Sequence, residues 1–336
     1  MNLDAYTAAH RALALVDASG LSGRVRASGP DAIDLLHRMS TNDLTPLIGH
    51  SGNGAQTVLT TEKGRIVDLL NVLSTNDGAL LVTGSDREDA VVQWLDKYVI
   101  MEDAKFTNVT AEISHFLVFG PSALGVLSSA TDVDLLGLAN FGSTEIAFGA
   151  VPVRIQRSHR IIESGFSIFC DAASHDAILS ALTELVTSNG GAVLDAETYE
   201  TIRIEAGIPS VPNELNEKHN PLETTLVQAI SWTKGCYIGQ EVIARLDTYD
   251  KVQRHLMGIR FDDALPASVP FPLQANDATE IGEVTSLTFS PGLNATIALA
   301  FVKTAFANPG AAVSAAGVAG TLTKLPFDIE VSYATH

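Results

Sequence analysis

The chain has 336 residues, of which 46% are hydrophobic and 18% are charged, and this length predicts two or three domains with a substantial core. The formal net charge of −18 argues against a general nucleic-acid-binding protein, because phosphate contacts need clustered Lys and Arg side chains. Two cysteines provide neither a disulfide framework nor a CxxC metal site, and no stretch reaches the roughly 18 apolar residues of a membrane span. Because the N-terminus also lacks a signal-peptide pattern, we expect a cytoplasmic protein without membrane or direct nucleic-acid partners.

The first elements along the chain are a helix and a set of strands. Residues 28–40 repeat apolar side chains at helical spacing, and Ser28 is in position to cap the helix N-terminus. Residues 57–85 have the pattern of three strands. Asn76-Asp77-Gly78 is expected to form the hairpin turn between the last two, because Asp-Gly tolerates a positive φ.

Further helices are predicted between strand-like segments. An amphipathic helix is expected over residues 85–100, with Ser85 and Glu88 as a capping box. A second helix is expected over residues 174–188, ended by Gly190-Gly191. Strands that are mostly joined by hairpins, with helices between them, indicate an α+β fold and not a doubly wound sheet.

The sequence changes in character from about Phe261. It first becomes rich in Pro and acidic residues and then continues as short β-type segments separated by Gly, Asn and Pro. These segments predict a small all-β barrel or sandwich. No GxGxxG or GxxxxGK[ST] motif supports a nucleotide-binding fold. We therefore expect two units, residues 1–254 and residues 255–336.

The segment most suggestive of chemistry is KGCYIGQE, residues 234–241. Gly235 and Gly239 punctuate a tight loop, and the chain from Gln240 onward has the pattern of a helix. Cys236 would then precede a helix N-terminus, whose free N–H groups and dipole favour an anion, and Lys234 adds a cation two residues away. Both effects should lower the pKa of the thiol below the free value of about 8.5.

A plainer interpretation of this loop is that the thiol fills a small gap and the lysine is solvated, because free cysteine is commonly a buried apolar residue. The constrained arrangement of the segment instead favours Cys236 and Lys234 as a reactive pair. The residues expected to support them are Gly235, Tyr237, Gly239, Gln240 and Glu241. Cys170 alternates with other strand residues and is expected in the core. The nine His residues show no HExxH or paired metal spacing, so no metal site is expected.

Four segments together resemble the YgfZ family, relatives of the T-protein (aminomethyltransferase) of the glycine cleavage system. KGCYIGQE is the most specific of them. The others are VRASGPDAIDLLHRMSTNDL, TIRIEAGIPSVPNELNEKHNPLE and GEVTSLTFSPGLNATIALAFV. They follow one another in the family's order and cover nearly the whole chain.

The resemblance implies a three-part, ring-like fold with a C-terminal β-barrel and a central channel that binds tetrahydrofolate. It also implies a role in assembling or repairing iron–sulfur clusters together with client or assembly proteins. Those clients would include Fe–S enzymes that methylthiolate tRNA. A channel with a few polar groups in an apolar wall is physically suited to a pterin.

The T-protein pattern is only partly kept in this sequence. The aspartate that lies near the reacting folate nitrogen in the T-protein corresponds to Asp68 in KGRIVDLL, where the second glycine and the second acid are missing. Ser167 stands in place of a glutamate of that family, and Tyr199 in place of an arginine. Arg203 and Glu205 are retained, either as folate contacts or as a structural ion pair or cap.

Three functions are expected as alternatives. The first is a folate-binding protein of Fe–S cluster maintenance, favoured by the missing carboxylate and the added thiol. Because a stable cluster normally takes four ligands, one cysteine would contact a cluster transiently or share it. The second is folate-dependent aminomethyl or methyl transfer, and the third is a folate-binding scaffold with a structural thiol.

Overall fold

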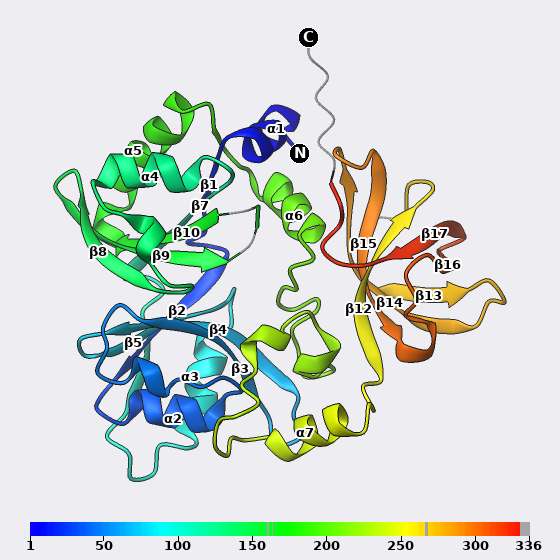
Figure 1. Ribbon diagram of the computed structural model, residues 1–336, viewed down its shortest axis with the longest axis horizontal. Helices are drawn as coiled ribbons and strands as arrows, with labels where there is room; N and C mark the ends of the chain where they lie inside the picture. The colour runs from blue at the N-terminus through cyan, green and yellow to red at the C-terminus, as the bar shows by residue number, and fades with distance from the viewer. Residues whose placement is uncertain (160, 163, 266–267, 330–336) are drawn as a thin grey trace.

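The computed structural model describes residues 1–159, 161–162, 164–265 and 268–329. Three parts surround a central helix, α6 (Ala196–Glu205), and the segment that follows it (Figure 1). Two parts are sheets with helices on one face, and the third is a closed barrel. The predicted α+β, three-part fold with a C-terminal β-barrel is therefore confirmed. No helix within the described residues is long and apolar enough to cross a membrane.

The first part is a five-stranded antiparallel sheet in the order β3-β4-β5-β2-β6. Two helices cover one face, and their leucines and valines form one core with the strands. The expected hairpin joins β4 to β5, where Thr75 pairs with Gly78. Gly78 has a φ of +138°, which explains why a glycine occupies this position. The elements are β2 (Ser22–Ser28), α2 (Ala32–Met39), β3 (Gly54–Thr60), β4 (Ile66–Thr75), β5 (Gly78–Gly84), α3 (Glu88–Asp96) and β6 (Lys105–Asn108).

The second part is a six-stranded sheet in the order β11-β1-β7-β10-β9-β8. Helices α4 and α5 cover one face and share a core with it, in which Cys170 of β10 is buried as expected. The opposite face is directed toward α6 (Figure 1). The elements are β1 (Ala14–Asp17), β7 (Ile113–Phe119), α4 (Ala123–Thr131), β8 (Ser143–Phe148), β9 (Val151–His159), β10 (Ser164–Asp171), α5 (His175–Ser188) and β11 (Ala192–Val193).

The third part is a closed six-stranded barrel in the order β12-β15-β14-β13-β16-β17. Its interior is filled by alternating apolar side chains of all six strands. The strands are β12 (Arg254–Phe261), β13 (Phe271–Ala275), β14 (Glu280–Ser290), β15 (Ala295–Lys303), β16 (Ala312–Ala315) and β17 (Val318–Thr323). Outside the three parts lie α1 (Leu3–Arg11), which packs beside α6, and α7 (Gln240–Thr248), which precedes the barrel.

Short 3-10 helices punctuate the connections between these elements. The described ones are Thr45–Leu47, Leu135–Gly137, Ala172–Ser174, Pro221–Glu223, Val227–Ala229 and Thr304–Phe306.

Two predicted helix caps are wrong. Ser28 ends strand β2, and α2 begins at Ala32 without a side-chain cap. The Ser85 hydroxyl donates to the Gly20 carbonyl, and α3 also begins without a side-chain cap. In both cases the cap residue is taken by the preceding strand or loop, a competition that local sequence does not reveal. The predicted end of α5 is confirmed, because the N–H of Gly191 donates to the Val186 carbonyl.

Candidate functional site

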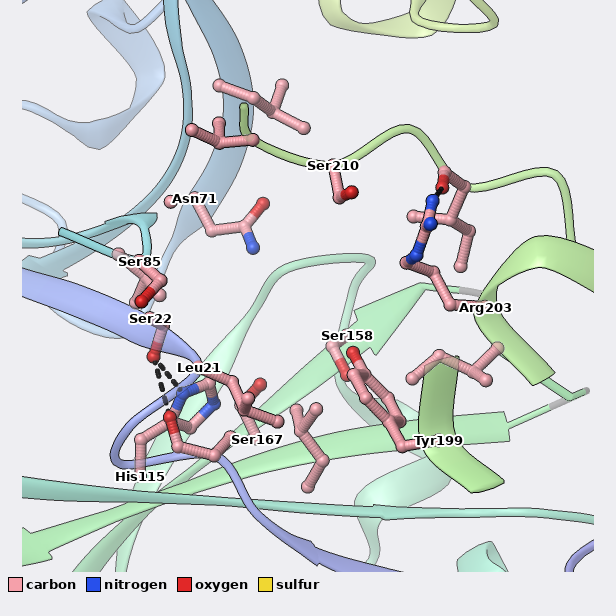
Figure 2. Close-up of a pocket in the computed structure, with 18 of the residues that line it drawn as sticks. Leu21, Ser22, Asn71, Ser85, His115, Ser158, Ser167, Tyr199, Arg203 and Ser210 are labelled. Carbon is pink, nitrogen blue, oxygen red and sulfur yellow. Dashed lines mark hydrogen bonds between the residues drawn. The ribbon is translucent and has the colours of Figure 1, made fainter. Parts of the chain in front are cut away.

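A cavity of about 690 Å³ lies between the two sheets and α6. Its walls come from the helix-free face of the six-stranded sheet, from β4 and β5, and from α6 with the loop after it (Figure 2). The volume falls in the range of about 300–1,000 Å³ that holds small-molecule ligands. None of the described barrel residues lines it.

The six-stranded sheet contributes alternate residues of two paired strands. His115, Leu117 and Phe119 of β7 line the cavity together with Gly165 and Ser167 of β10. The antiparallel register pairs Gly165 with Phe119 and Ser167 with Leu117, so these side chains share one face of the sheet. The side chains of the intervening residues of both strands pack under α4 and α5, although Val118 and Phe166 also border the cavity. The alternation thus separates a cavity face from a core face.

Helix α6 supplies the opposite wall through Tyr199 and Arg203. The Tyr199 ring lies 6.5 Å from the ring of Phe119, measured between centroids. Burial raises the pKa of Tyr199 to about 12, so its phenol remains a hydrogen-bond donor at neutral pH. The cavity therefore has two aromatic rings with a hydroxyl beside them.

Asp68 lines the cavity from β4 and is fully buried. One carboxyl oxygen accepts the N–H of Leu69 at 2.8 Å and the other accepts the N–H of Gly84 at 3.1 Å. A carboxylate has about four lone-pair sites, so two remain for a ligand. Burial raises the pKa of Asp68 to about 7, although the two N–H groups and Arg87 act in the opposite direction. The carboxyl is therefore poised between its acid and base forms near neutral pH.

Arg203 also borders the cavity, but protein acceptors occupy its guanidinium. Nε and Nη2 donate to the carboxylate of Glu200, Nη1 donates to the Ile208 carbonyl and to Glu214, and Nη2 donates to Ser286. These contacts use all five N–H groups of the side chain. Arg203 therefore ties α6 to the barrel and leaves no N–H for a ligand.

Glu205 lies outside the cavity lining among the described residues. It accepts hydrogen bonds from the Tyr6 hydroxyl at 2.8 Å and from Ser290 at 2.5 Å. These contacts join α1, α6 and β14. The retained Arg203 and Glu205 thus have the structural contacts that the alternative interpretation of the sequence expects.

Lys234 is buried and its ammonium is similarly occupied. Its three N–H groups donate to the carbonyls of His37, Ser40 and Asn42 at 2.5, 2.8 and 2.7 Å. These carbonyls end α2 and begin the next loop, where helical partners are missing. Burial lowers the pKa of Lys234 to about 8, while Asp43 acts to raise it. The lysine therefore braces one loop against another.

Gly239 is a second residue of the KGCYIGQE loop with a structural role. Its φ is +81°, and an added Cβ would lie 2.5 Å from the Thr61 carbonyl and 3.0 Å from Cα of Gly64. Gly235 has open space around it and no positive φ. Gly239 therefore permits the close approach of the loop to the β3–β4 turn, whereas packing gives no reason for Gly235.

Cys236 is exposed, four residues before the first residue of α7. Tyr237 is buried, with the Lys234 ammonium 5.1 Å from its ring centroid. Gln240 and Glu241 occupy the first turn of α7 as expected. No described residue from 234 to 241 lines the cavity. The structure thus brings Asp68, Tyr199 and Arg203 together and places the cysteine loop elsewhere.

Several polar cavity residues were not predicted from the sequence. They are Ser22, Gln56, Asn71, Ser85, His115, Ser158 and Ser210. They come from β2, β3, β4, β7, β9 and two loops. Ser210 lies in a family segment and Ser85 in a predicted capping box, but neither was expected to line a cavity, and the other five belong to no motif. Only the tertiary contact of the two sheets brings them together.

The cavity residues fit the ring system of a folate better than its carboxylate tail. Two aromatic rings, the Asp68 carboxyl and the unpartnered Nε2 of His115 suit a flat heterocycle with N–H and carbonyl groups. Arg203 is the only Lys or Arg among the described lining residues, and its N–H groups are all used. No further described cation in the lining is available for a carboxylate.

These features define a two-sheet, one-barrel protein with a central ligand cavity. The sequence matches the GCVT N-terminal domain over residues 3–234 and the glycine cleavage T-protein C-terminal barrel domain over residues 254–328. The chain belongs to this T-protein family. Tetrahydrofolate is the cofactor of the family's aminomethyltransferases, in agreement with the cofactor expected from the sequence.

Named relatives agree with this family. The aminomethyltransferase of Listeria monocytogenes serotype 4b is 31% identical over 291 residues, covering 86% of this chain and 78% of the relative. An Arabidopsis thaliana protein named "Putative transferase At1g60990, chloroplastic" is 26% identical over 326 residues, covering 96% and 73%. The crystal structure of aminomethyltransferase T from Bartonella henselae superposes with a TM-score of 0.83 at 21% identity, covering 97% of this chain and 89% of that one. This last similarity shows the fold alone.

Proposed function

We propose that this chain binds tetrahydrofolate in the central cavity and transfers an aminomethyl or methyl group to or from it. The observation that carries the proposal is Asp68, a buried carboxyl with two free lone-pair sites on the wall of a cavity of ligand size. Membership of a family whose named relatives are aminomethyltransferases supports the same reading.

Asp68 would hold or move the proton at the reacting nitrogen. Tetrahydrofolate supplies nitrogens that carry one-carbon units when it is bound. A pKa of about 7 lets the carboxyl accept and return a proton at neutral pH, which is the requirement for general acid–base catalysis. Because the second acid of the T-protein pair is missing and Ser167 stands in place of a glutamate of that family, Asp68 would do this work without them. Tyr199 and Phe119 would hold the ring between them.

The test combines binding with turnover. Titration calorimetry should show binding of tetrahydrofolate, and transfer should be followed from a lipoyl-carried aminomethyl donor and from N-methyl donors. Asp68→Asn should lower turnover about 10²- to 10⁴-fold, the usual worth of a positioned acid–base group, with a much smaller change in folate affinity. Asp77→Asn, on the exposed hairpin turn, is the matched control. Full turnover in Asp68→Asn, or no folate binding by the unmodified chain, would contradict the proposal.

A second candidate function is maintenance of iron–sulfur clusters in the manner of the YgfZ family. The observation that favours it is the exposed Cys236 on a loop braced by Lys234. The thiol would meet an Fe–S client or assembly protein at the surface and share a ligand position transiently. Complementation of a strain that lacks its own YgfZ-type protein tests this function. Rescue by the unmodified chain and failure of Cys236→Ser would support it, and equal rescue by both would remove the thiol from the function.

A further inference from the structure

His115 has one ring nitrogen bound to the protein and one that is not. Nδ1 lies 2.8 Å from the Ser22 hydroxyl (Figure 2). The ring stacks on Phe169 at 4.6 Å between centroids, with 14° between the planes. Nε2 is buried and has no hydrogen-bond partner among the described residues. The side chain lines the cavity.

The hydrogen bonds of Ser22 favour one tautomer of His115. The Ser22 oxygen lies 3.1 Å from the Ala18 carbonyl, which can only accept, so a hydroxyl that donates there can still accept from the imidazole. Arg24 also donates to the Ser22 oxygen, at 3.3 Å. With the hydrogen on Nδ1, the hydroxyl makes all three of these hydrogen bonds, whereas donating to Nδ1 would give up the bond to Ala18, so we place the hydrogen on Nδ1. Nε2 is left with a bare lone pair.

The environment keeps this imidazole neutral. Burial, and then the nearby guanidinium of Arg24, lower the pKa of His115 to about 3. Neutral imidazole with the hydrogen on Nδ1 can only accept at Nε2. A buried acceptor without a donor costs about 1–3 kcal/mol, and such groups in folded proteins are usually paired with a ligand or water.

We propose that His115 is a specificity-determining residue whose Nε2 accepts a hydrogen bond from a ring N–H of the bound pteridine. This inference rests on the proposed folate binding. Pteridines of the tetrahydrofolate type have ring N–H donors at N3, N5 and N8. Ligand groups that can only accept, such as a carboxylate oxygen, would meet the lone pair unfavourably. His115 therefore selects a ring with a donor at this position.

Affinity for matched analogues tests the inference. Tetrahydrofolate is compared with 3-deaza, 5-deaza and 8-deaza analogues, each of which lacks one ring N–H. The unmodified protein should bind one of the analogues about 10- to 100-fold more weakly than tetrahydrofolate, as expected for an unpaired buried acceptor. In His115→Phe, which keeps a ring to stack on Phe169, that difference should fall to about threefold or less by the same reasoning.

The control variant is His175→Phe. His175 lies in the same part of the molecule and is not among the cavity-lining residues described, so the preference between ligands should be unchanged. Thermal unfolding of both variants establishes that they fold. If His115→Phe weakens all four ligands equally and keeps the preference, His115 only shapes the wall and the inference is wrong.

Nitrogen NMR gives a readout that does not depend on activity. In ¹⁵N-histidine-labelled protein, the unprotonated Nε2 resonance of His115 should move toward lower ppm on addition of tetrahydrofolate, as an acceptor does when it gains a donor. Folate binding with an unmoved resonance would overturn the inference and leave the proposed function standing. No binding by the unmodified protein would instead overturn the proposed function.

Discussion

The carboxyl of Asp68 and the ammonium of Lys234 are both withdrawn from water, yet the protein uses their hydrogen-bonding capacity differently. Lys234 gives all three N–H groups to backbone carbonyls. Asp68 accepts two backbone N–H groups and keeps two lone-pair sites unused on a cavity wall. The hydrogen-bonding capacity of the lysine is thus filled without a ligand, whereas that of the carboxyl is not.

The same comparison of used and unused hydrogen-bonding groups distinguishes Arg203 from His115. Arg203 borders the cavity with every N–H donor occupied, whereas His115 borders it with a free acceptor. Unused capacity in a buried group costs free energy, so a stable fold retains it mainly where a ligand completes it. Position on the wall alone does not distinguish a ligand contact from a brace.

The largest effect expected from this comparison is on the pH dependence of stability. The folded-state pKa of Asp68 is about 7 and the ordinary value is 3.8. Between these values the unfolded chain has released the proton and the folded chain has kept it. The free energy of unfolding therefore falls as pH rises through this window. Relative to Asp68→Asn, the wild type should lose up to about 4 kcal/mol between about pH 4 and pH 8.

Urea unfolding of both proteins across this pH range measures the difference. At any one pH the Asn variant also bears the cost of an amide facing the Gly84 N–H, but that cost does not vary with pH. Asp68→Ser has neither the carboxyl nor the amide, and it should show the same slope against the wild type. Parallel curves for all three proteins would mean that folding leaves the pKa of Asp68 unchanged.

Lys234→Met should be the next largest change. It leaves three carbonyls near the end of α2 without their donor, in a region where the side chain is only 9% exposed. We expect a loss of about 2–4 kcal/mol in the free energy of unfolding, measured in urea. Lys63→Met, at an exposed position on the β3–β4 turn, should change stability by less than about 0.5 kcal/mol. Equal stability of the two variants would show that Lys234 is not a brace.

Much of the fold could be predicted from the sequence because its signals are local. Alternation and turn residues gave the β4–β5 hairpin, and the short segments after Phe261 gave the barrel. The helix starts were wrong because Ser28 and Ser85 had other partners. A capping pattern shows which hydrogen bond a side chain could make at a helix start, but tertiary contacts determine which bond it makes.

The site could be predicted only where a family motif marked it. Asp68 was found in this way, whereas His115 and Ser22 carry no motif and meet through the contact of two sheets. The three hydrogen bonds of the Lys234 ammonium could not be predicted either, because its partners are carbonyls 192 to 197 residues earlier in the chain. Every residue has a backbone carbonyl, so the sequence does not indicate which carbonyls accept a hydrogen bond from a distant side chain.

The two glycines of the KGCYIGQE loop give a smaller, internally controlled test. Gly239→Ala should lower the free energy of unfolding by about 1–3 kcal/mol, because the residue has a φ of +81° and an added Cβ meets the Thr61 carbonyl at 2.5 Å. Gly235→Ala, with open space around it, should change it by less than about 0.5 kcal/mol. Thermal or urea unfolding of both variants suffices. A larger loss for Gly235→Ala would show that the loop is packed differently.

The smallest expected effect is that of Cys236 on folate binding. The thiol is exposed on a loop that does not line the cavity among the described residues, and Cys170 is buried. A thiol reagent should therefore modify one cysteine per folded chain, and saturating tetrahydrofolate should not slow the reaction. Cys236→Ser should bind tetrahydrofolate within about twofold of the wild type, since surface changes away from a site are usually worth less than about 0.5 kcal/mol.

Folate protection of Cys236 would instead bring the loop to the ligand. Lys234 would then still brace the loop, but it would do so to hold the thiol against the folate. The cavity and the loop would then form one ligand site and not two separate regions. Absence of protection, together with loss of Fe–S complementation in Cys236→Ser, would assign the two regions to two different partners. The cavity would then hold the folate, and the braced loop would present its thiol to a protein.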